Sequence, residues 1–223
     1  MVEDAAAAMP WRGEAQRADK VLLAVLGISG LYQLALLPLV PSLVASHPLL
    51  LAVVRGSSTA IVTLGALART GHGSLAVAVL AGLPATIMFD WVFWWAGRRW
   101  GERSFALFLG NKASAGRRTE QVQRLSRRYG VALVLFSYLL PIPNPLIDAA
   151  AGLGGMRLRT FLVCDAVSGL LWTGLLAGLG YAIGQAAVDV VESIAHYSLW
   201  LTIALVVLVV ARQLVPGRRR PRT

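Results

Sequence analysis

The sequence predicts an all-α integral membrane protein with about four transmembrane helices and two opposed re-entrant helical hairpins that form an inverted repeat. Hydrophobic residues make up 57% of the 223, and the mean hydropathy of +0.64 exceeds that of ordinary soluble domains. Several apolar runs reach the roughly 20 residues that a helix needs to cross a bilayer. Residues 137–155 place three prolines inside an apolar stretch. Broken backbone at membrane depth is tolerated only where protein or a water-filled cavity surrounds it.

Four apolar runs predict the transmembrane helices, at residues 21–44, 75–96, 160–184 and 194–211. Two further apolar stretches, 48–68 and 131–153, contain polar or proline residues, and each is predicted to enter the membrane and return on the same side. The remaining parts are an N-terminal segment, a basic loop and a basic tail, at residues 1–20, 97–129 and 212–223.

The distribution of charge predicts which parts face the cytoplasm. Nine basic and two acidic residues lie between positions 98 and 128, and the tail adds five arginines, whereas residues 185–196 contain no Lys or Arg. Because basic loops stay on the cytoplasmic side, both termini and the central loop are predicted there, in a multi-pass protein of a bacterial-type plasma (inner) membrane. The net charge of +10 is therefore explained by anionic lipid headgroups at 98–128, and nucleic acid is not expected.

The chain contains a candidate inverted repeat. Each half has an interrupted segment, a glycine-rich turn, a spanning helix and a Gly-x-x-x-Gly ending, at Gly97/Gly101 and Gly180/Gly184. Paired interrupted segments in two inverted halves point to the substrate site of a transporter. The alternative is that small residues serve helix packing alone.

Ionisable residues within the apolar segments are the first site candidates, because a charge inside a membrane is costly. Arg55 could hold a phosphate through two hydrogen bonds or neutralise a buried aspartate. Asp90 could contact substrate, accept a proton or pair with Arg55. Asp165, close to the cytoplasmic edge, is either a coupling acid or an interfacial residue.

The breaks of the two interrupted segments supply the other candidates. Asn144 is predicted as the N-cap of a half-helix with Pro145 in its first position, and Asp148 would share its face. The positive end of such a half-helix attracts anions. The residues predicted to break the segments are Gly56, Pro141, Pro143 and Pro145. The residues predicted to line the substrate path are Arg55, Ser57, Ser58, Thr59, Asp90, Asn144 and Asp148.

Motifs of enzyme chemistry are missing from the sequence. It has no nucleotide-binding loop, no Gly-x-Ser-x-Gly, three unclustered histidines and the single cysteine Cys164. Enzymatic activity, a metal site and a cofactor are therefore not expected.

The segment Pro141-Ile-Pro-Asn-Pro-Leu-Ile-Asp148 and the Gly180-Tyr-x-x-Gly184 ending resemble the second half of the DedA / SNARE-associated (VTT-domain) membrane family. Asp90, with residues 94–101, resembles the end of its first half. The resemblance covers about residues 45–185, and the Pro-Asn-Pro-Leu-x-Asp string is most similar to the vacuole membrane protein branch. It implies two opposed re-entrant hairpins and transbilayer movement of phospholipid or polyprenyl phosphate. Bacterial members have arginines where this chain has Tyr138 and Asn144, and an acid in the first loop that is missing here, which favours a scramblase-like path.

The sequence therefore predicts a scramblase or flippase for phospholipid or polyprenyl-phosphate headgroups, acting between the two re-entrant loops. One alternative is a proton- or sodium-coupled transporter of a small solute, with Asp90 and Asp148 as coupling acids. Another is a membrane scaffold or assembly factor whose basic loop binds a partner. The protein could form a homo-oligomer under each of these three proposed functions.

Overall fold

The computed structural model describes residues 10, 11, 14–109, 120, 124, 126 and 128–186, and all of its regular structure within these residues is helical. Three helices in this part are long and apolar enough to cross a membrane: Arg17–Ser46, Leu75–Trp100 and Leu158–Ile183. The all-α membrane class is thereby confirmed. The predicted helix 194–211, the basic tail and most of the loop 97–129 lie outside the described residues.

The first of these helices bends near its end. It consists of α2 (Arg17–Leu36), the 3₁₀ turn η1 (Leu37–Leu39) and α3 (Val40–Ser46), where the sequence predicted one helix over 21–44. Pro38 lies in the turn and has no N–H for the α-helical ladder, which explains the change of helix type.

The second long helix is interrupted in its middle. α6 (Leu75–Ile87) ends before Met88 and Phe89, and α7 (Asp90–Trp100) continues beyond them. Pro84 lies inside α6, where it removes a backbone hydrogen bond and crowds the preceding turn. α8 (Arg103–Leu109) follows, whereas the third helix, α12 (Leu158–Ile183), is continuous.

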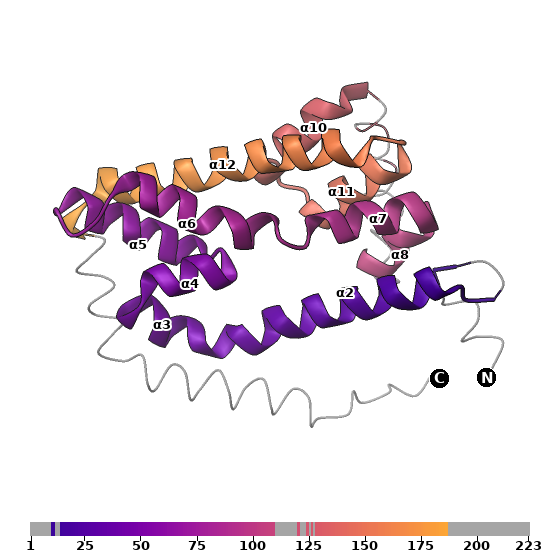
Figure 1. Cartoon of the computed structure of the whole chain (residues 1–223). Helices are drawn as coiled ribbons and strands as arrows, with labels where there is room; N and C mark the ends of the chain where they lie inside the picture. Colours follow the sequence, from indigo (N-terminus) through magenta and orange to yellow (C-terminus); the bar gives the residue numbers. More distant parts are fainter. Residues whose placement is uncertain are drawn as a thin grey trace, which may run out of the picture.

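Two short helix pairs lie at opposite ends of these long helices. The first comprises α4 (Pro48–Arg55) and α5 (Ser58–Arg69), and the second comprises α10 (Val131–Leu135), η2 (Ser137–Leu139) and α11 (Asn144–Leu153). In Figure 1, α4 and α5 lie near the start of α6 and the end of α12, while α10 and α11 lie near the end of α7 and the start of α12. Two opposed re-entrant hairpins require this arrangement.

Glycines let α5, from the first pair, approach α12 closely. A Cβ on Gly65 of α5 would collide with the carbonyl of Ala177, and one on Gly180 of α12 would collide with the carbonyl of Val62. Gly65 therefore faces Ala177, three positions before Gly180, and Gly180 faces Val62, three positions before Gly65.

The contact between α7 and α11 has the same spacing. A Cβ on Gly97 would collide with the carbonyl of Ala149, and one on Gly152 would collide with the carbonyl of Trp94. The two spanning helices also end alike, at Gly101 and Gly184, which have φ near +60°. This repeated geometry supports the internal repeat that the Gly-x-x-x-Gly endings predicted.

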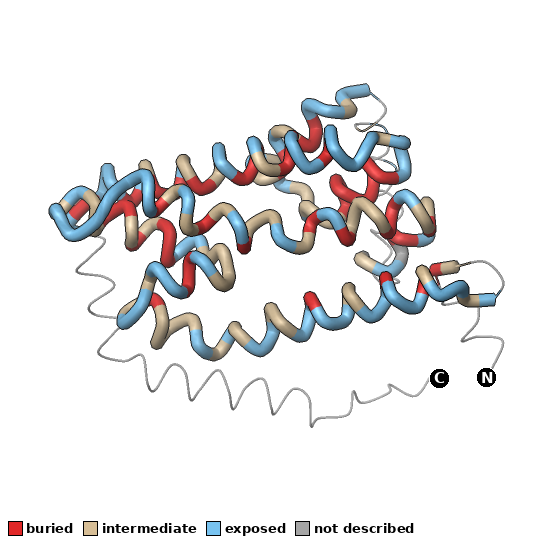
Figure 2. The backbone as a smooth tube through the Cα atoms, in the orientation of Figure 1, coloured by how far each residue is buried: buried red, intermediate tan, exposed pale blue. Residues whose placement is uncertain are grey.

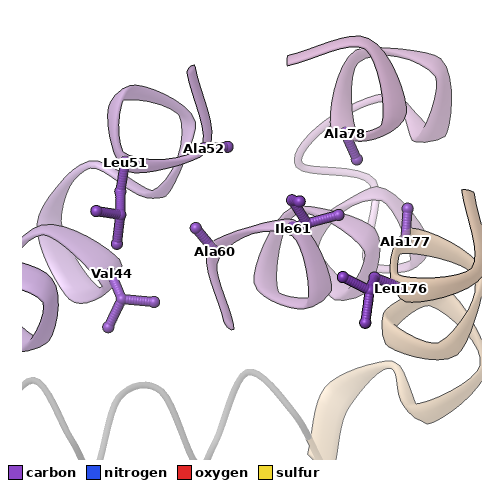
Figure 3. Close-up of a cluster of buried hydrophobic side chains, with 8 residues drawn as sticks. All are labelled: Val44, Leu51, Ala52, Ala60, Ile61, Ala78, Leu176 and Ala177. Carbon is purple, nitrogen blue, oxygen red and sulfur yellow. The ribbon is translucent and has the colours of Figure 1, made fainter. Parts of the chain in front are cut away.

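Apolar side chains both fill the interior and cover the outside. One core cluster joins α3, α4, α5, α6 and α12 through Val44, Leu51, Ala52, Ala60, Ile61, Ala78, Leu176 and Ala177 (Figure 3). Exposed and buried residues alternate along α12, whereas α2 is mostly exposed or intermediate (Figure 2). The exposed large apolar residues include Leu31 of α2, Leu80 of α6 and Val163 of α12. Large apolar side chains on the outer faces of long helices suit contact with lipid.

The N-terminal segment lies beside the end of α7. Asp19, at the start of α2, accepts hydrogen bonds from Arg99 Nε at 2.5 Å and from Trp100 Nε1 at 2.9 Å. The N-terminal segment and the first residues of the loop 97–129 therefore share one end of the protein, as the charge distribution predicted.

His47 and His72 line a cavity of about 600 Å³ at the start of α6.

Candidate functional site

The two interrupted segments meet at one residue, Thr86, in the last turn of α6. A Cβ on Gly56 would lie 2.7 Å from Thr86 Oγ1 and 2.9 Å from its backbone nitrogen, so the first break fits against α6 only because it is glycine. Gly56 also has φ +63°, which favours glycine. From the second segment, the Tyr138 hydroxyl lies 3.0 Å from the Thr86 carbonyl oxygen, to which it can donate. The first break and the η2 turn of the second segment thus both reach the interruption between α6 and α7.

Tyr138 connects this contact to a buried carboxylate. Its hydroxyl lies 2.5 Å from Asp90 Oδ2, so its one proton can be donated either to this oxygen or to the Thr86 carbonyl. Its ring stacks on Trp172 with centroids 6.5 Å apart. Sequence reasoning identified position 138 only through the missing family arginine. Thr86 carried no sequence signal, because a threonine within an apolar helix is ordinary.

Three of the predicted acids form one cluster. Asp90, Asp148 and Asp165 are 9%, 1% and 1% exposed, and they come from α7, α11 and α12. The three carboxyl groups lie close enough to interact electrostatically. The packing of α7, α11 and α12 therefore brings three mutually repelling groups together.

Within the described residues, Asp148 Oδ2 and both Asp165 carboxyl oxygens have no hydrogen-bond donor. Arg99 forms an ion pair with Asp19, and no described cation pairs with Asp90, Asp148 or Asp165. The pairing of Arg55 with Asp90, which the sequence left open, is thus not formed.

The polar residues of the first break line a separate groove of about 430 Å³. Arg55 Nη1 is shielded from solvent there and has no hydrogen-bond partner among the described residues. The Ser57 and Thr59 hydroxyl oxygens lie 2.8 Å apart. The residues that line the groove are Gln33, Leu37, Val40, Arg55, Gly56, Ser57, Ser58 and Thr59.

The second break differs in detail from its prediction. Asn144 is the first residue of α11, Pro143 is its N-cap, and no side chain caps the helix, so the capping role predicted for Asn144 is wrong by one position. Pro145 lies in the first turn, where a missing N–H breaks no intrahelical bond. Pro141 and Pro143 occupy the non-helical stretch between η2 and α11. Asn144 and Asp148 are one turn apart on the same helix, as predicted.

Most of the predicted path residues therefore form two groups, the Arg55 groove and the acidic cluster, with Thr86 between them. Asn144 belongs to neither group. No group of three or more His, Cys, Asp or Glu side chains in the described part could hold a metal ion.

A comparison with protein families matches the VTT domain to residues 53–182, which is more than half of the chain. The chain belongs to the VTT-domain family. The matched region of the VTT domain contains both breaks, the acidic cluster and the two glycine-lined helix contacts, whereas α2 precedes it. A search of curated proteins and a search of solved structures each found no match.

Proposed function

We propose that this VTT-domain protein moves phospholipid or polyprenyl-phosphate headgroups between the two leaflets, as a scramblase or flippase, along a path at the two helix breaks. The observation that carries the proposal is the meeting of both interrupted segments at Thr86, through Gly56 and Tyr138, beside the interruption of a spanning helix. The Pro-Asn-Pro-Leu-x-Asp string adds a resemblance to the vacuole membrane protein branch. We place the protein in a bacterial-type plasma membrane with both termini cytoplasmic.

The chemistry of the groove suits a polar headgroup inside a membrane. A headgroup that enters hydrocarbon loses its hydrogen bonds to water, at a cost of several kcal/mol for each unsatisfied group. The hydroxyls of Ser57, Ser58 and Thr59 can replace some of these bonds, and Arg55 offers a charged partner to a phosphate. The acyl chains would remain in the lipid around the apolar outer faces. Downhill scrambling needs no nucleotide site.

The acidic cluster favours a second candidate, a proton-coupled transporter of a small solute. Asp90, Asp148 and Asp165 are buried and form no ion pair with any cation in the described part of the chain, so protonation of one carboxyl group would change the charge of the interior. This reading requires solute uptake that depends on a proton gradient and continues without lipid movement. The scaffold reading concerns the loop 98–128, and it requires that deletion of this loop abolishes function while Asp90→Asn and Asp148→Asn retain it.

The test is reconstitution in liposomes with labelled neutral, zwitterionic and polyprenyl-phosphate lipids. We expect the wild type to exchange at least one probe between leaflets faster than protein-free liposomes. We expect Arg55→Gln and Asp148→Asn to slow this exchange several-fold. Arg69→Gln is the matched control, because Arg69 ends α5 as Arg55 ends α4 but lies exposed over the Tyr181 ring. A wild type that exchanges no probe above the background of protein-free liposomes would contradict the proposal.

A further inference from the structure

The groove at Arg55 is closed on one side by residues from outside the VTT match. Gln33, Leu37 and Val40 come from α2, η1 and α3, all before residue 53, while the other lining residues belong to the first break. Within this wall only Gln33 has a side chain that forms hydrogen bonds. A VTT domain without these residues would leave the groove open.

A hydrogen bond fixes this wall beside Arg55. The Tyr32 hydroxyl donates to the Val54 carbonyl oxygen at 2.5 Å, and the Tyr32 ring meets Phe89 edge-on with centroids 5.7 Å apart. The last carbonyls of a helix have no intrahelical partner, and Val54 directly precedes the final residue of α4. Tyr32 therefore joins α2 to the end of α4, and Gln33 follows it in the sequence.

The charges around the groove define the chemistry of its ligand. Its lining contains the cation Arg55 and no acidic residue. Arg55 Nη1 has no acceptor among the described residues, although buried donors are normally hydrogen-bonded. The three buried acids belong to the other group of residues, next to Tyr138. The groove thus offers an anion a charged donor, while the Gln33 amide can both donate and accept a hydrogen bond.

We propose that Gln33 is a specificity-determining residue of the headgroup site. A phosphate lies beside Arg55, and the Gln33 amide contacts the group that the phosphate carries. This assignment rests on the proposed function, because it assumes that a lipid headgroup occupies the groove. It adds that α2, which lies outside the family domain, selects among headgroups.

The test compares two labelled probes in proteoliposomes, anionic phosphatidylglycerol and zwitterionic phosphatidylcholine, for the full chain. In Gln33→Glu a carboxylate stands beside Arg55 and competes with the phosphate, and it also repels a net negative headgroup. We expect the ratio of the phosphatidylglycerol rate to the phosphatidylcholine rate to fall at least fivefold. In Gln33→Leu the hydrogen bonds to the substituent are lost, and we expect the same ratio to change at least twofold. Leu34→Gln is the control, because Leu34 is an exposed neighbour on α2 that does not line the groove. Its ratio should equal that of the wild type.

The outcomes separate this assignment from the proposed function. A wild type that moves neither these probes nor labelled polyprenyl phosphate overturns the proposed function and this assignment with it. A wild type that moves only the polyprenyl phosphate overturns this assignment alone. A wild type that moves the probes, together with Gln33 variants that keep its ratio, overturns this assignment alone. Thermal unfolding of each variant in detergent shows whether it is folded. If Gln33→Glu is not folded, Gln33→Leu provides the test.

Discussion

Tyr138 is the residue on which most of the site's contacts converge. Its hydroxyl reaches Asp90 and the Thr86 carbonyl, and its ring stacks on Trp172, so it links the second break to α6, α7 and α12. Hydrogen bonds to charged groups contribute about 1.5–3 kcal/mol in soluble proteins, but interhelical bonds in membranes average less. The Tyr138 hydroxyl therefore has a measurable but limited effect on stability.

Replacement of Tyr138 by Phe removes the hydroxyl and keeps the ring stack. We expect the free energy of unfolding to fall by about 1–2 kcal/mol, which lowers the midpoint of thermal unfolding by roughly 3–6 °C for a chain of this size. The measurement is thermal unfolding in detergent at fixed pH. Tyr129→Phe serves as the control, since Tyr129 is half exposed and its ring lies beside Arg128. Equal midpoints for Tyr138→Phe and wild type would show that this hydrogen bond contributes nothing to stability.

At the scale of single residues, the sequence indicated which positions carry charge but not how they group. Asp90, Asp148 and Asp165 were each identifiable, because a charge in an apolar run stands out. Their clustering depends on the packing of α7, α11 and α12, which no local pattern encodes. Arg55 was predicted either to hold a phosphate or to neutralise one of these acids, and it lines a separate groove without pairing with them.

Among the elements, the close contacts α5–α12 and α7–α11 are the strongest sign of a repeat. In both contacts two glycines face backbone carbonyls with the same three-residue offset, so any side chain at these positions forces the helices apart. The sequence predicted the glycine endings 97/101 and 180/184. It did not indicate their partners Gly65 and Gly152, because isolated glycines are common in membrane helices.

Gly97→Ala and Gly180→Ala should both destabilise the protein, because each Cβ meets a backbone carbonyl that cannot move without its helix. We expect a loss of about 1–3 kcal/mol in the free energy of unfolding for each. Gly174→Ala lies on the same helix as Gly180 but meets nothing within 4 Å, so it should be neutral or slightly stabilising. Thermal unfolding of the three variants gives the comparison. If Gly97→Ala and Gly180→Ala both unfold at the wild-type midpoint, the helices are not as close as described.

Helix boundaries were the least predictable part of the elements. The interruption at Met88 and Phe89 follows Pro84, yet a single proline in an apolar run is also compatible with a kinked continuous helix. The 3₁₀ turn at Pro38 has the same origin. The breaks at Gly56 and at residues 140–143 were predictable, because glycine or several prolines adjoin polar residues there.

At the scale of the whole molecule, the two helix pairs lie at opposite ends of the long helices (Figure 1), and each makes a contact with Thr86 in the middle of one of them. The first pair contributes the groove that contains Arg55. The second pair contributes Tyr138, which contacts Asp90 of the buried acidic cluster. α2 then closes the groove from outside the VTT domain. A lipid headgroup can cross a membrane along a polar path between broken helices. Its acyl chains stay in the membrane, against the apolar outer faces.

The central claim is that headgroups pass through the Arg55 groove, and a steric block tests it most directly. Ser58 is exposed in the groove, so Ser58→Trp fills it without disturbing the core, while Leu31→Trp places the same side chain on the exposed face of α2. The measurement is the rate of leaflet exchange of labelled phospholipid in proteoliposomes. We predict rapid exchange for wild type and Leu31→Trp and an at least tenfold slower rate for Ser58→Trp. Exchange by Ser58→Trp at the wild-type rate would contradict the account.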